Sequence, residues 1–307
     1  MKSNLKIKVI GIGGAGGNTI FRLSKCKLVG VELIAINTDF QDLKKIKADF
    51  KIQIGEKITK GLGAGMNPEK GKKAALESKA EISEILKGSD MVFIAGGLGG
   101  GTFSGAAPII AKIAKDLGCL TIVIATKPFS FEGGQRKKIA RTALKNLEDK
   151  VDALISISNN RLTKLANGKT SLDYSFSLGD QILREAILGI SELILKPGII
   201  NLDFASIKSI LKNSGRALIA QGEAQGKNRA LVAVKKALSC PLLDFSPKGA
   251  RGILFNVTGR DLELNEIKLI ADTICQNVNK NAKIVFGARE DKSLKKDQIK
   301  IMLIVTL

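Results

Sequence analysis

Two glycine-rich segments contain the residues of this chain best suited to bind an anion. The first, Gly11-Ile-Gly-Gly-Ala-Gly-Gly-Asn18, follows an apolar run that predicts a strand. The second has six glycines between Gly96 and Gly105, after the apolar run 91–95 and before a helix-like run. Because glycine has no Cβ, backbone N–H groups can approach an anion closely, and the helix N-terminus behind them adds partial positive charge. Two such loops predict one polyphosphate ligand held from two sides.

The segments around these loops alternate between apolar strands and amphipathic helices. Besides the run before the second glycine loop, strands are predicted at 6–12, 31–36, 120–125 and 153–157. This alternation favours an α/β domain of Rossmann-like type, with a mostly parallel sheet and helices on both faces. Ligands bind at the carboxyl ends of such strands, where both glycine loops lie.

The second half of the chain has a different pattern. Residues 177–195 are apolar at helical spacing on more than one face, which predicts a long central helix buried between two domains and ended by Pro197-Gly198. Beyond residue 215, strand-like and helical runs indicate a smaller α+β domain. We therefore expect domains at 1–176 and 215–307, joined by the segment 177–214.

Composition limits the possible classes of protein. With 44% hydrophobic and 25% charged residues, the 307-residue chain is typical of a soluble globular protein, and we expect neither a signal peptide nor a membrane span. The absence of histidine excludes catalytic histidines and histidine-ligated metals. Four scattered cysteines predict reduced thiols and a cytoplasmic protein.

The net charge of +20 has two possible explanations. Lysines outnumber arginines 39 to 10, although arginine is the preferred reader of bases and phosphates, and few aromatic residues lie among the lysines. We therefore expect no specific nucleic-acid partner. The bias of an A+T-rich genome is the favoured explanation, and a functional basic surface is the alternative.

Three further motifs resemble those of one family. They are Ile54-Gly-Glu-Lys-Ile-Thr-Lys-Gly-Leu-Gly-Ala-Gly-Met-Asn-Pro-Glu69, Thr126-Lys-Pro-Phe-Ser-Phe-Glu132 and Pro197-Gly-Ile-Ile-Asn-Leu-Asp-Phe-Ala205. With these motifs in this order, the chain resembles FtsZ, the tubulin-like cell-division GTPase of bacteria. The resemblance extends from about residue 6 to the end of the chain. The resemblance implies a GTP-binding domain and subunits that stack head to tail into filaments of the division ring, in the cytoplasm at mid-cell. It also implies GTP or GDP and Mg²⁺ as ligands, with a monovalent cation as a further candidate.

The resemblance assigns roles to individual residues. The two glycine loops would bind the nucleotide phosphates. Their residues are Gly13, Gly14, Ala15, Gly16, Gly17, Asn18, Gly99, Gly100, Gly101, Thr102 and Phe103. A loop that senses the γ-phosphate would consist of Ala64, Gly65, Met66 and Asn67. Glu132 and Arg136 would contact the ribose and phosphate side of the nucleotide. Asn159 and Asp180 would read guanine, because a carboxylate accepts from the ring N1–H and the exocyclic amine.

Catalysis in this family is completed across the subunit interface. Here Asn201 and Asp203 would enter the nucleotide site of the next subunit, where Asp203 is also a candidate cation contact; no other metal ligand is assigned. The family's second acidic residue is replaced by Ser206, which cannot accept a proton as a carboxylate does. Loss of an acid/base group typically costs roughly 10²–10⁴ in rate, so we expect slow hydrolysis.

Two other departures concern nucleotide binding. Phe103 replaces a glycine, and its Cβ is expected to conflict with a positive φ or to crowd the phosphates, so that Phe103→Gly tightens binding. The aromatic ring expected beside the base aligns with Ser175, and either Tyr174 or Phe176 replaces it by a shift in register. The linker and tail that follow the family's core are also expected to be missing, which leaves membrane-anchoring partners unknown.

Three alternatives remain open. The replacements at Phe103 and Ser206 are compatible with a structural filament that binds GTP without hydrolysing it. A tubulin-like plasmid-partitioning filament would account for the basic charge. Gly11, Gly13 and Gly16 after a strand, with Asp39 downstream, also match a dinucleotide-binding pattern, but the absent histidine and the second glycine loop disfavour a dehydrogenase.

Overall fold

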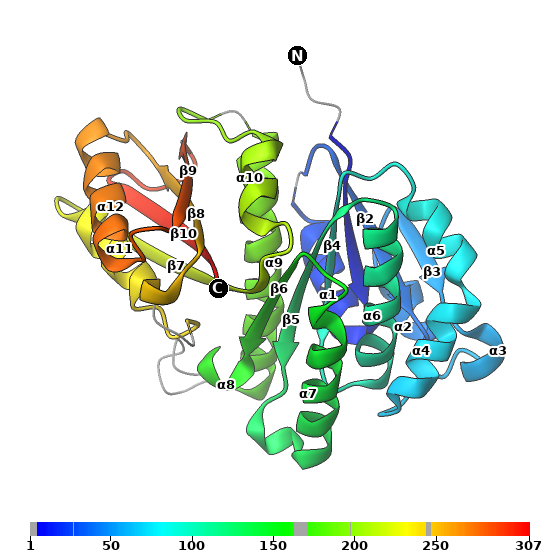
Figure 1. Ribbon diagram of the computed structural model, residues 1–307. Coiled ribbons are helices and arrows are strands. Elements are labelled where there is room, and N and C mark those ends of the chain that lie inside the picture. Colours follow the sequence, from blue (N-terminus) through cyan, green and yellow to red (C-terminus); the bar gives the residue numbers. More distant parts are fainter. Residues whose placement is uncertain (1–4, 27, 163–170, 197, 244–246) are drawn as a thin grey trace. The chain divides into compact units, whose positions relative to one another are not determined.

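The computed structural model describes residues 5–26, 28–162, 171–196, 198–243 and 247–307 (Figure 1). The chain forms two compact units, Met1–Ile187 and Leu188–Leu307. The division falls within the long helix α9 (Leu172–Leu195). Among the helices of the described residues, none is both long and apolar enough to cross a bilayer.

The first unit is built on six parallel strands in the order β3-β2-β1-β4-β5-β6. Their bounds are β1 Ile7–Ile12, β2 Val31–Asn37, β3 Phe50–Gln53, β4 Met91–Gly97, β5 Leu120–Lys127 and β6 Ala153–Ser158. All six residues of β1 are buried, as expected of a central parallel strand covered on both faces. The predicted strands are confirmed to within two residues. Only β3 was missed, because four residues that begin with two exposed side chains carry little apolar signal.

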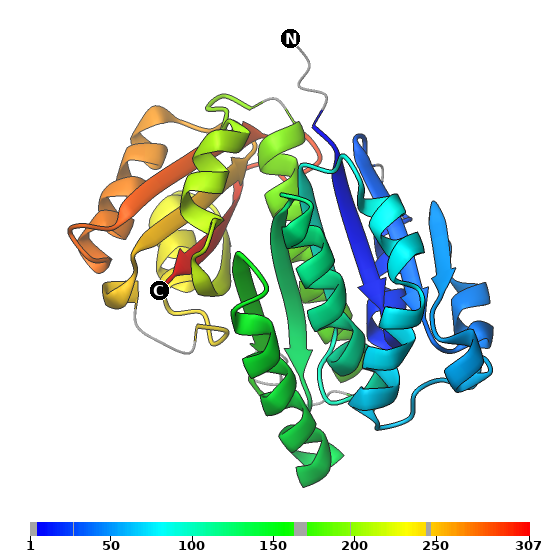
Figure 2. The ribbon, with the colours of Figure 1, turned by 45° about the vertical axis from the view of Figure 1, so that its right-hand side comes forward.

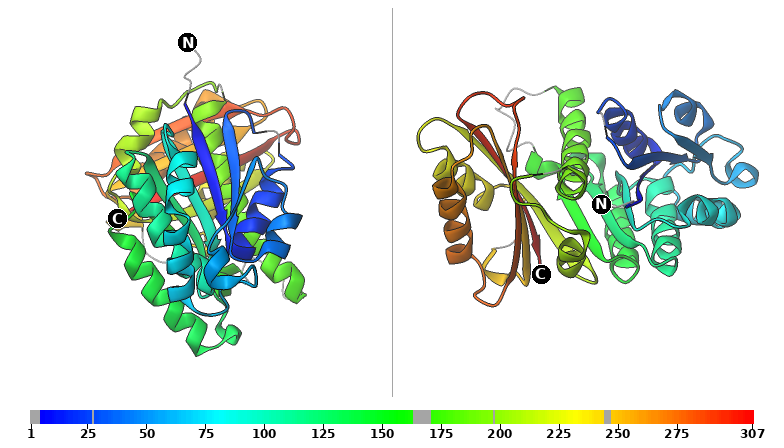
Figure 3. Two further views of the ribbon diagram at one scale, coloured as in Figure 1. Left: turned by 90° about the vertical axis from the view of Figure 1, so that its right-hand side faces the viewer. Right: turned by 90° about the horizontal axis from the view of Figure 1, so that it is seen from above.

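Helices cover both faces of this sheet (Figures 2 and 3). The helices of this unit before α9 are α1 Gly13–Leu23, α2 Phe40–Lys45, α3 Glu56–Thr59, α4 Pro68–Glu77, α5 Lys79–Leu86, α6 Gly101–Asp116, α7 Gly134–Glu148 and α8 Asn159–Leu162, with a 3₁₀ turn η1 at Ser130–Glu132. Ile10, Ile94 and Ile110 belong to the buried core between the sheet and the helical layer that contains α6. Helix α1 follows β1 directly and α6 follows β4 after three residues, which places both N-termini at one edge of the sheet.

The second unit has a four-stranded sheet in the order β7-β10-β8-β9. Strand β10 (Gln298–Thr306) is antiparallel to β7 (Gly215–Gln225) and β8 (Gly252–Gly259), whereas β8 and β9 (Lys283–Glu290) are parallel. Helices α11 (Arg229–Leu238) and α12 (Leu264–Asn277) pack against each other on one side of this sheet (Figure 1). Helix α10 (Phe204–Leu211) contacts β8 and β9, and a 3₁₀ turn η2 lies at Pro247–Gly249. The predicted smaller α+β domain is confirmed.

Helix α9 begins five residues earlier than predicted. The hydroxyl group of Ser171 accepts a hydrogen bond from the backbone N–H of Tyr174 (3.2 Å), which is how a serine caps a helix N-terminus. The early start places Phe176 within the helix rather than in a loop. Pro197, the predicted stop signal, lies outside the described residues, and the placement of α9 between two domains stays a prediction.

Candidate nucleotide-binding site

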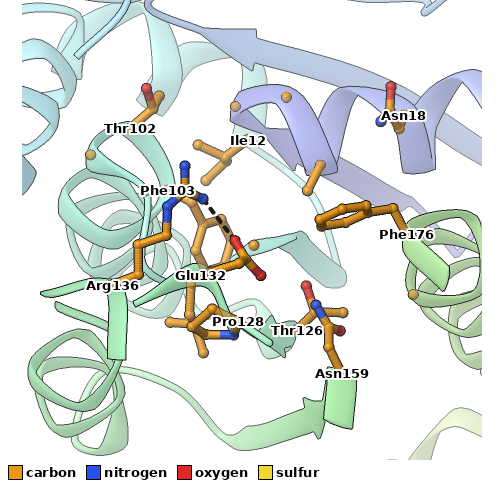
Figure 4. A pocket seen from close by; sticks show the side chains of 18 of the residues that line it. Ile12, Asn18, Thr102, Phe103, Thr126, Pro128, Glu132, Arg136, Asn159 and Phe176 are labelled. Atoms are coloured by element: carbon orange, nitrogen blue, oxygen red, sulfur yellow. Dashed lines mark hydrogen bonds and ion pairs between the residues drawn. The ribbon is translucent and has the colours of Figure 1, made fainter. Parts of the chain in front are cut away.

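A cavity of about 410 Å³ opens at the carboxyl ends of β1, β4, β5 and β6 (Figure 4). This size falls within the usual range for small-molecule sites. All of the residues that line it belong to the first unit. They are Ile12, Gly13, Gly14, Ala15, Asn18, Gly65, Gly97, Leu98, Gly100, Gly101, Thr102, Phe103, Thr126, Pro128, Glu132, Arg136, Asn159, Phe176, Gly179 and Asp180.

The first glycine loop is a direct junction between β1 and α1. Gly13 has a φ of 69°, a left-handed conformation that favours glycine. A Cβ on Gly11 would overlap the carbonyl oxygen of Gly16, so these glycines let α1 pack closely against the strand. In the described chain no side chain caps the N-terminus of α1, and its first turn contains no acidic residue. Its backbone N–H groups are therefore available to an anion.

The second glycine loop brings the N-terminus of α6 to the same cavity. Gly99 has a φ of 97°, and its N–H donates to Ser104 Oγ at 3.0 Å. Gly100 is the N-cap residue of α6, and in the part of the chain that the structure describes no side chain caps this helix. Two helix N-termini thus converge on one cavity, the arrangement predicted for a polyphosphate.

Phe103 differs from expectation. Its backbone is helical within α6, so no positive φ is required, and the expected conflict with backbone geometry is absent. The side chain is only 2% exposed and packs over Gly96, where a Cβ would overlap the aromatic ring. The ring fills space that Gly96 leaves, and it forms part of the cavity wall. The structure therefore removes the backbone argument for tighter binding by Phe103→Gly.

The predicted γ-phosphate loop contributes one lining residue, Gly65, which has a φ of 58°. Ala64 is buried. Met66 is exposed, and Asn67 acts as the N-cap of α4 by accepting from the backbone N–H groups of Glu69 and Lys70. Among the described residues, the other predicted phosphate-site residues that do not line the cavity are Gly16, Gly17 and Gly99. They lie beside the residues that do.

Glu132 and Arg136 form an ion pair on one wall of the cavity, with 3.0 Å between Oε2 and Nη1 (Figure 4). The other carboxylate oxygen of Glu132 accepts from the N–H of Phe129 at 2.8 Å. The carboxylate is thereby fixed at the end of η1. The pair lies near the second glycine loop, since the backbone of Arg136 is close to Gly99.

Asn159 and Asp180 supply two acceptors at the other end of the cavity. Asn159 is buried, and within the described residues its Oδ1 has no hydrogen-bond partner. A buried acceptor of this kind usually has a donor, so a ligand donor at this position would satisfy it. Burial raises the pKa of Asp180 to about 6, against the opposing effects of Arg22 and Asn18.

Of the two aromatic residues proposed to replace the missing ring, Phe176 is the one that lines the cavity. It lies four residues before Asp180 on α9, on the same face of the helix, and both side chains line the cavity. Neither Tyr174 nor Ser175 is among the described lining residues. The ring of Phe176 packs edge-on against Phe129, with centroids 5.3 Å apart. The four-residue spacing from Asp180 is the signal in the sequence that could have distinguished Phe176 from Tyr174.

The predicted catalytic residues belong to the second unit. Asn201 Oδ1 accepts from the N–H of Gly198 at 2.6 Å, and Ile200 pairs with Ala288 of β9. Asp203 is exposed and caps α10 by accepting from the N–H of Ser206 at 2.7 Å. Hydrogen bonds from Ser206 lower the pKa of Asp203, so it is a carboxylate at neutral pH.

Comparison with known proteins identifies the family. Residues 6–167 match the model of the GTPase domain of the Tubulin/FtsZ family. The chain belongs to this family. Residues 215–307 match the C-terminal domain of the FtsZ family.

Individual relatives agree over nearly the whole chain. Cell division protein FtsZ 1 of Pyrococcus horikoshii and that of Pyrococcus abyssi are each 45% identical to this chain over 301 residues, which is 98% of this chain and 80% of theirs. The structure of an empty FtsZ dimer from M. jannaschii is 44% identical, covers 99% of this chain and 88% of that chain, and superimposes with a TM-score of 0.95. The tubulin/FtsZ fold predicted from the motifs is confirmed.

Proposed function

We propose that this chain binds GTP, hydrolyses it, and polymerises head to tail into a filament that acts in cell division. Membership of the Tubulin/FtsZ GTPase family and the names of the Pyrococcus relatives support this role. The dimer formed by the related M. jannaschii protein supports self-association. The division ring at mid-cell is the place where such a filament would act.

The observation that carries the assignment to GTP is the pair of acceptors at one end of the cavity, opposite two helix N-termini. Guanine presents donors at N1 and at its exocyclic amine, which match Asp180 and the unpartnered Asn159 Oδ1. Adenine presents an acceptor at N1, which would face a carboxylate. The ring of Phe176 provides an aromatic surface beside the base. The backbone N–H groups of the glycine loops would donate hydrogen bonds to the phosphates.

Hydrolysis in this proposal needs the loop of a second subunit. Phosphoryl transfer depends on positioning and electrostatics, so an ionised Asp203 would orient the attacking water and offset the charge of a cation. Asn201 would contribute its amide N–H groups, because its oxygen is engaged with Gly198. Mg²⁺ would be held mainly by nucleotide phosphates, as is common for this ion, and a monovalent cation stays a further candidate.

The replacement of an acidic residue by Ser206 supports a second candidate function, that of a structural filament. A filament that binds GTP but hydrolyses it slowly or not at all would serve as a structural scaffold. Ser206 donates its backbone N–H to Asp203, and so it contributes to the loop without adding a negative charge.

Calorimetric titration with GTP, GDP and ATP tests the binding proposal directly. We expect GTP and GDP to bind and ATP to bind at least a hundredfold more weakly, because a site built to hydrogen-bond a group rejects a ligand that lacks it. Equal affinity for ATP and GTP would contradict the assignment of Asn159 and Asp180 to guanine.

A further inference from the structure

Thr38 connects two parts of the site that lie far apart in the sequence. It follows β2 directly, its side chain is fully buried, and its Oγ1 lies 2.8 Å from Oγ1 of Thr102. Thr102 stands in the first turn of α6 and lines the cavity. Thr38 itself is not among the described lining residues, so it acts on the site through Thr102.

The backbone of Thr38 contacts the segment 59–63, which leads into the predicted γ-phosphate loop. Its carbonyl oxygen accepts from the N–H of Gly63 at 3.4 Å. Thr59 Oγ1 lies 3.2 Å from the same oxygen and shares its proton between it and the carbonyl oxygen of Gly55 at 3.0 Å. Two residues beyond Gly63, the carbonyl oxygen of Gly65 accepts from the N–H of Gly101 at 2.9 Å. A closed set of hydrogen bonds therefore runs from Thr102 through Thr38 to the loop and back to the first turn of α6.

The direction of the hydroxyl–hydroxyl bond matters for an anionic ligand. A hydroxyl group has one proton to donate, and a phosphate oxygen can only accept it. If Thr38 donates to Thr102 Oγ1, the proton of Thr102 is free to point into the cavity. The buried position of Thr38 favours this arrangement, because a buried hydroxyl donor needs a partner and Thr102 Oγ1 is the one beside it.

We infer that Thr38 is a positioning residue whose hydroxyl group turns that of Thr102 toward the terminal phosphate. The inference rests on the proposed binding of GTP. It assigns Thr38 a role in distinguishing GTP from GDP, since only GTP carries the terminal phosphate toward which the hydroxyl group of Thr102 is turned.

The test compares the GTP and GDP affinities of four proteins by calorimetry, with thermal unfolding as a check on folding. Thr38→Val keeps the shape of the side chain but removes the hydroxyl group, whereas Thr38→Ser retains the hydroxyl group. Thr121→Val is the matched control, because Thr121 is also fully buried but bonds Cys119 at the opposite end of the sheet.

We expect Thr38→Val to lower the affinity for GTP relative to GDP by roughly tenfold, the usual effect of one hydrogen bond to a charged group. Thr38→Ser and Thr121→Val should keep the wild-type ratio. An unchanged ratio in Thr38→Val, or equal losses for GTP and GDP, would overturn the inference.

Two further variants keep the test decisive. If Thr38→Val does not fold, Thr38→Ala removes the same hydroxyl group with less crowding, and the same shift in the ratio of GTP to GDP affinity is expected. Combining Thr38→Val with Thr102→Val should add nothing to the effect of Thr102→Val on the ratio, because both changes remove one interaction; an additive effect would contradict the inference. Wild-type protein that binds neither nucleotide would instead overturn the proposed function.

Discussion

Arg22 Nε lies 3.7 Å from Asp180 Oδ2, and this ion pair joins α1 to α9 beside the cavity. Helix α1 begins at the first glycine loop, and α9 carries the carboxylate assigned to the base. The pair therefore joins the last turn of α1 to the carboxylate that is proposed to read the base. It also sets the charge of Asp180, because burial raises the pKa of that carboxyl group to about 6 and Arg22 opposes the rise.

Nucleotide affinity should depend on pH through Asp180. The donors of guanine need the ionised carboxylate, so binding weakens as pH falls through the pKa near 6, by about tenfold between pH 7 and pH 5. Arg22→Gln removes the cation that lowers this pKa, and we expect the midpoint of the pH profile to move upward. Arg141→Gln, on the exposed part of α7, is the control. Identical profiles for wild type and Arg22→Gln would argue against the electrostatic role of Arg22.

Asn159 should discriminate between GTP and ITP, which lacks the exocyclic amine. We expect wild-type protein to bind ITP roughly tenfold more weakly than GTP, because Asn159 Oδ1 would again be buried without a partner. In Asn159→Ala this preference should disappear, whereas Asn160→Ala, the adjacent amide outside the described lining, should retain it. Competition binding with both nucleotides measures the ratio, and a preference that survives in Asn159→Ala would refute the assignment.

Phe103→Gly should destabilise the first unit. Truncation of a buried phenylalanine costs about 3–5 kcal/mol, and glycine inside α6 adds about 1 kcal/mol. We expect a fall in Tm of about 10 °C or more by differential scanning calorimetry. Phe131→Gly, which changes an exposed phenylalanine outside α6, should have a small effect. A Phe103→Gly protein as stable as wild type would show that the ring does not support the fold.

Ser206→Asp should accelerate hydrolysis. It restores a second acidic residue in the loop, and the first turn of α10 tolerates negative charge. We expect kcat to rise at least tenfold, within the range usual for an acid/base group. Ser209→Asp, an exposed change on the same helix, serves as the control. Equal rates for wild type and Ser206→Asp would mean that Asp203 suffices.

The sequence predicted those parts of the site that depend on local backbone chemistry. Gly13 and Gly99 adopt left-handed conformations at junctions between strands and helices, and such junctions leave a clear glycine pattern. The family motifs supplied Asn159 and Asp180. Both depend on three-dimensional placement that no short pattern records.

Other features could not be predicted because they depend on tertiary packing. Phe103 was expected to disturb a glycine loop, but the missing side chain of Gly96 makes room for its ring. The contact between Thr38 and Thr102 joins residues 64 positions apart, and neither residue is unusual in its local sequence. The sequence does not separate Phe176 from Tyr174, because the choice depends on the start of α9 at the Ser171 cap.

The most direct test of the central claim measures phosphate release from GTP with Mg²⁺ alongside pelleting of polymer, over a series of protein concentrations. The account predicts that release begins only at the concentration where polymer appears, and that Asp203→Ala pellets without releasing phosphate. Release that is proportional to protein concentration below the onset of polymer would contradict an active site completed by a second subunit.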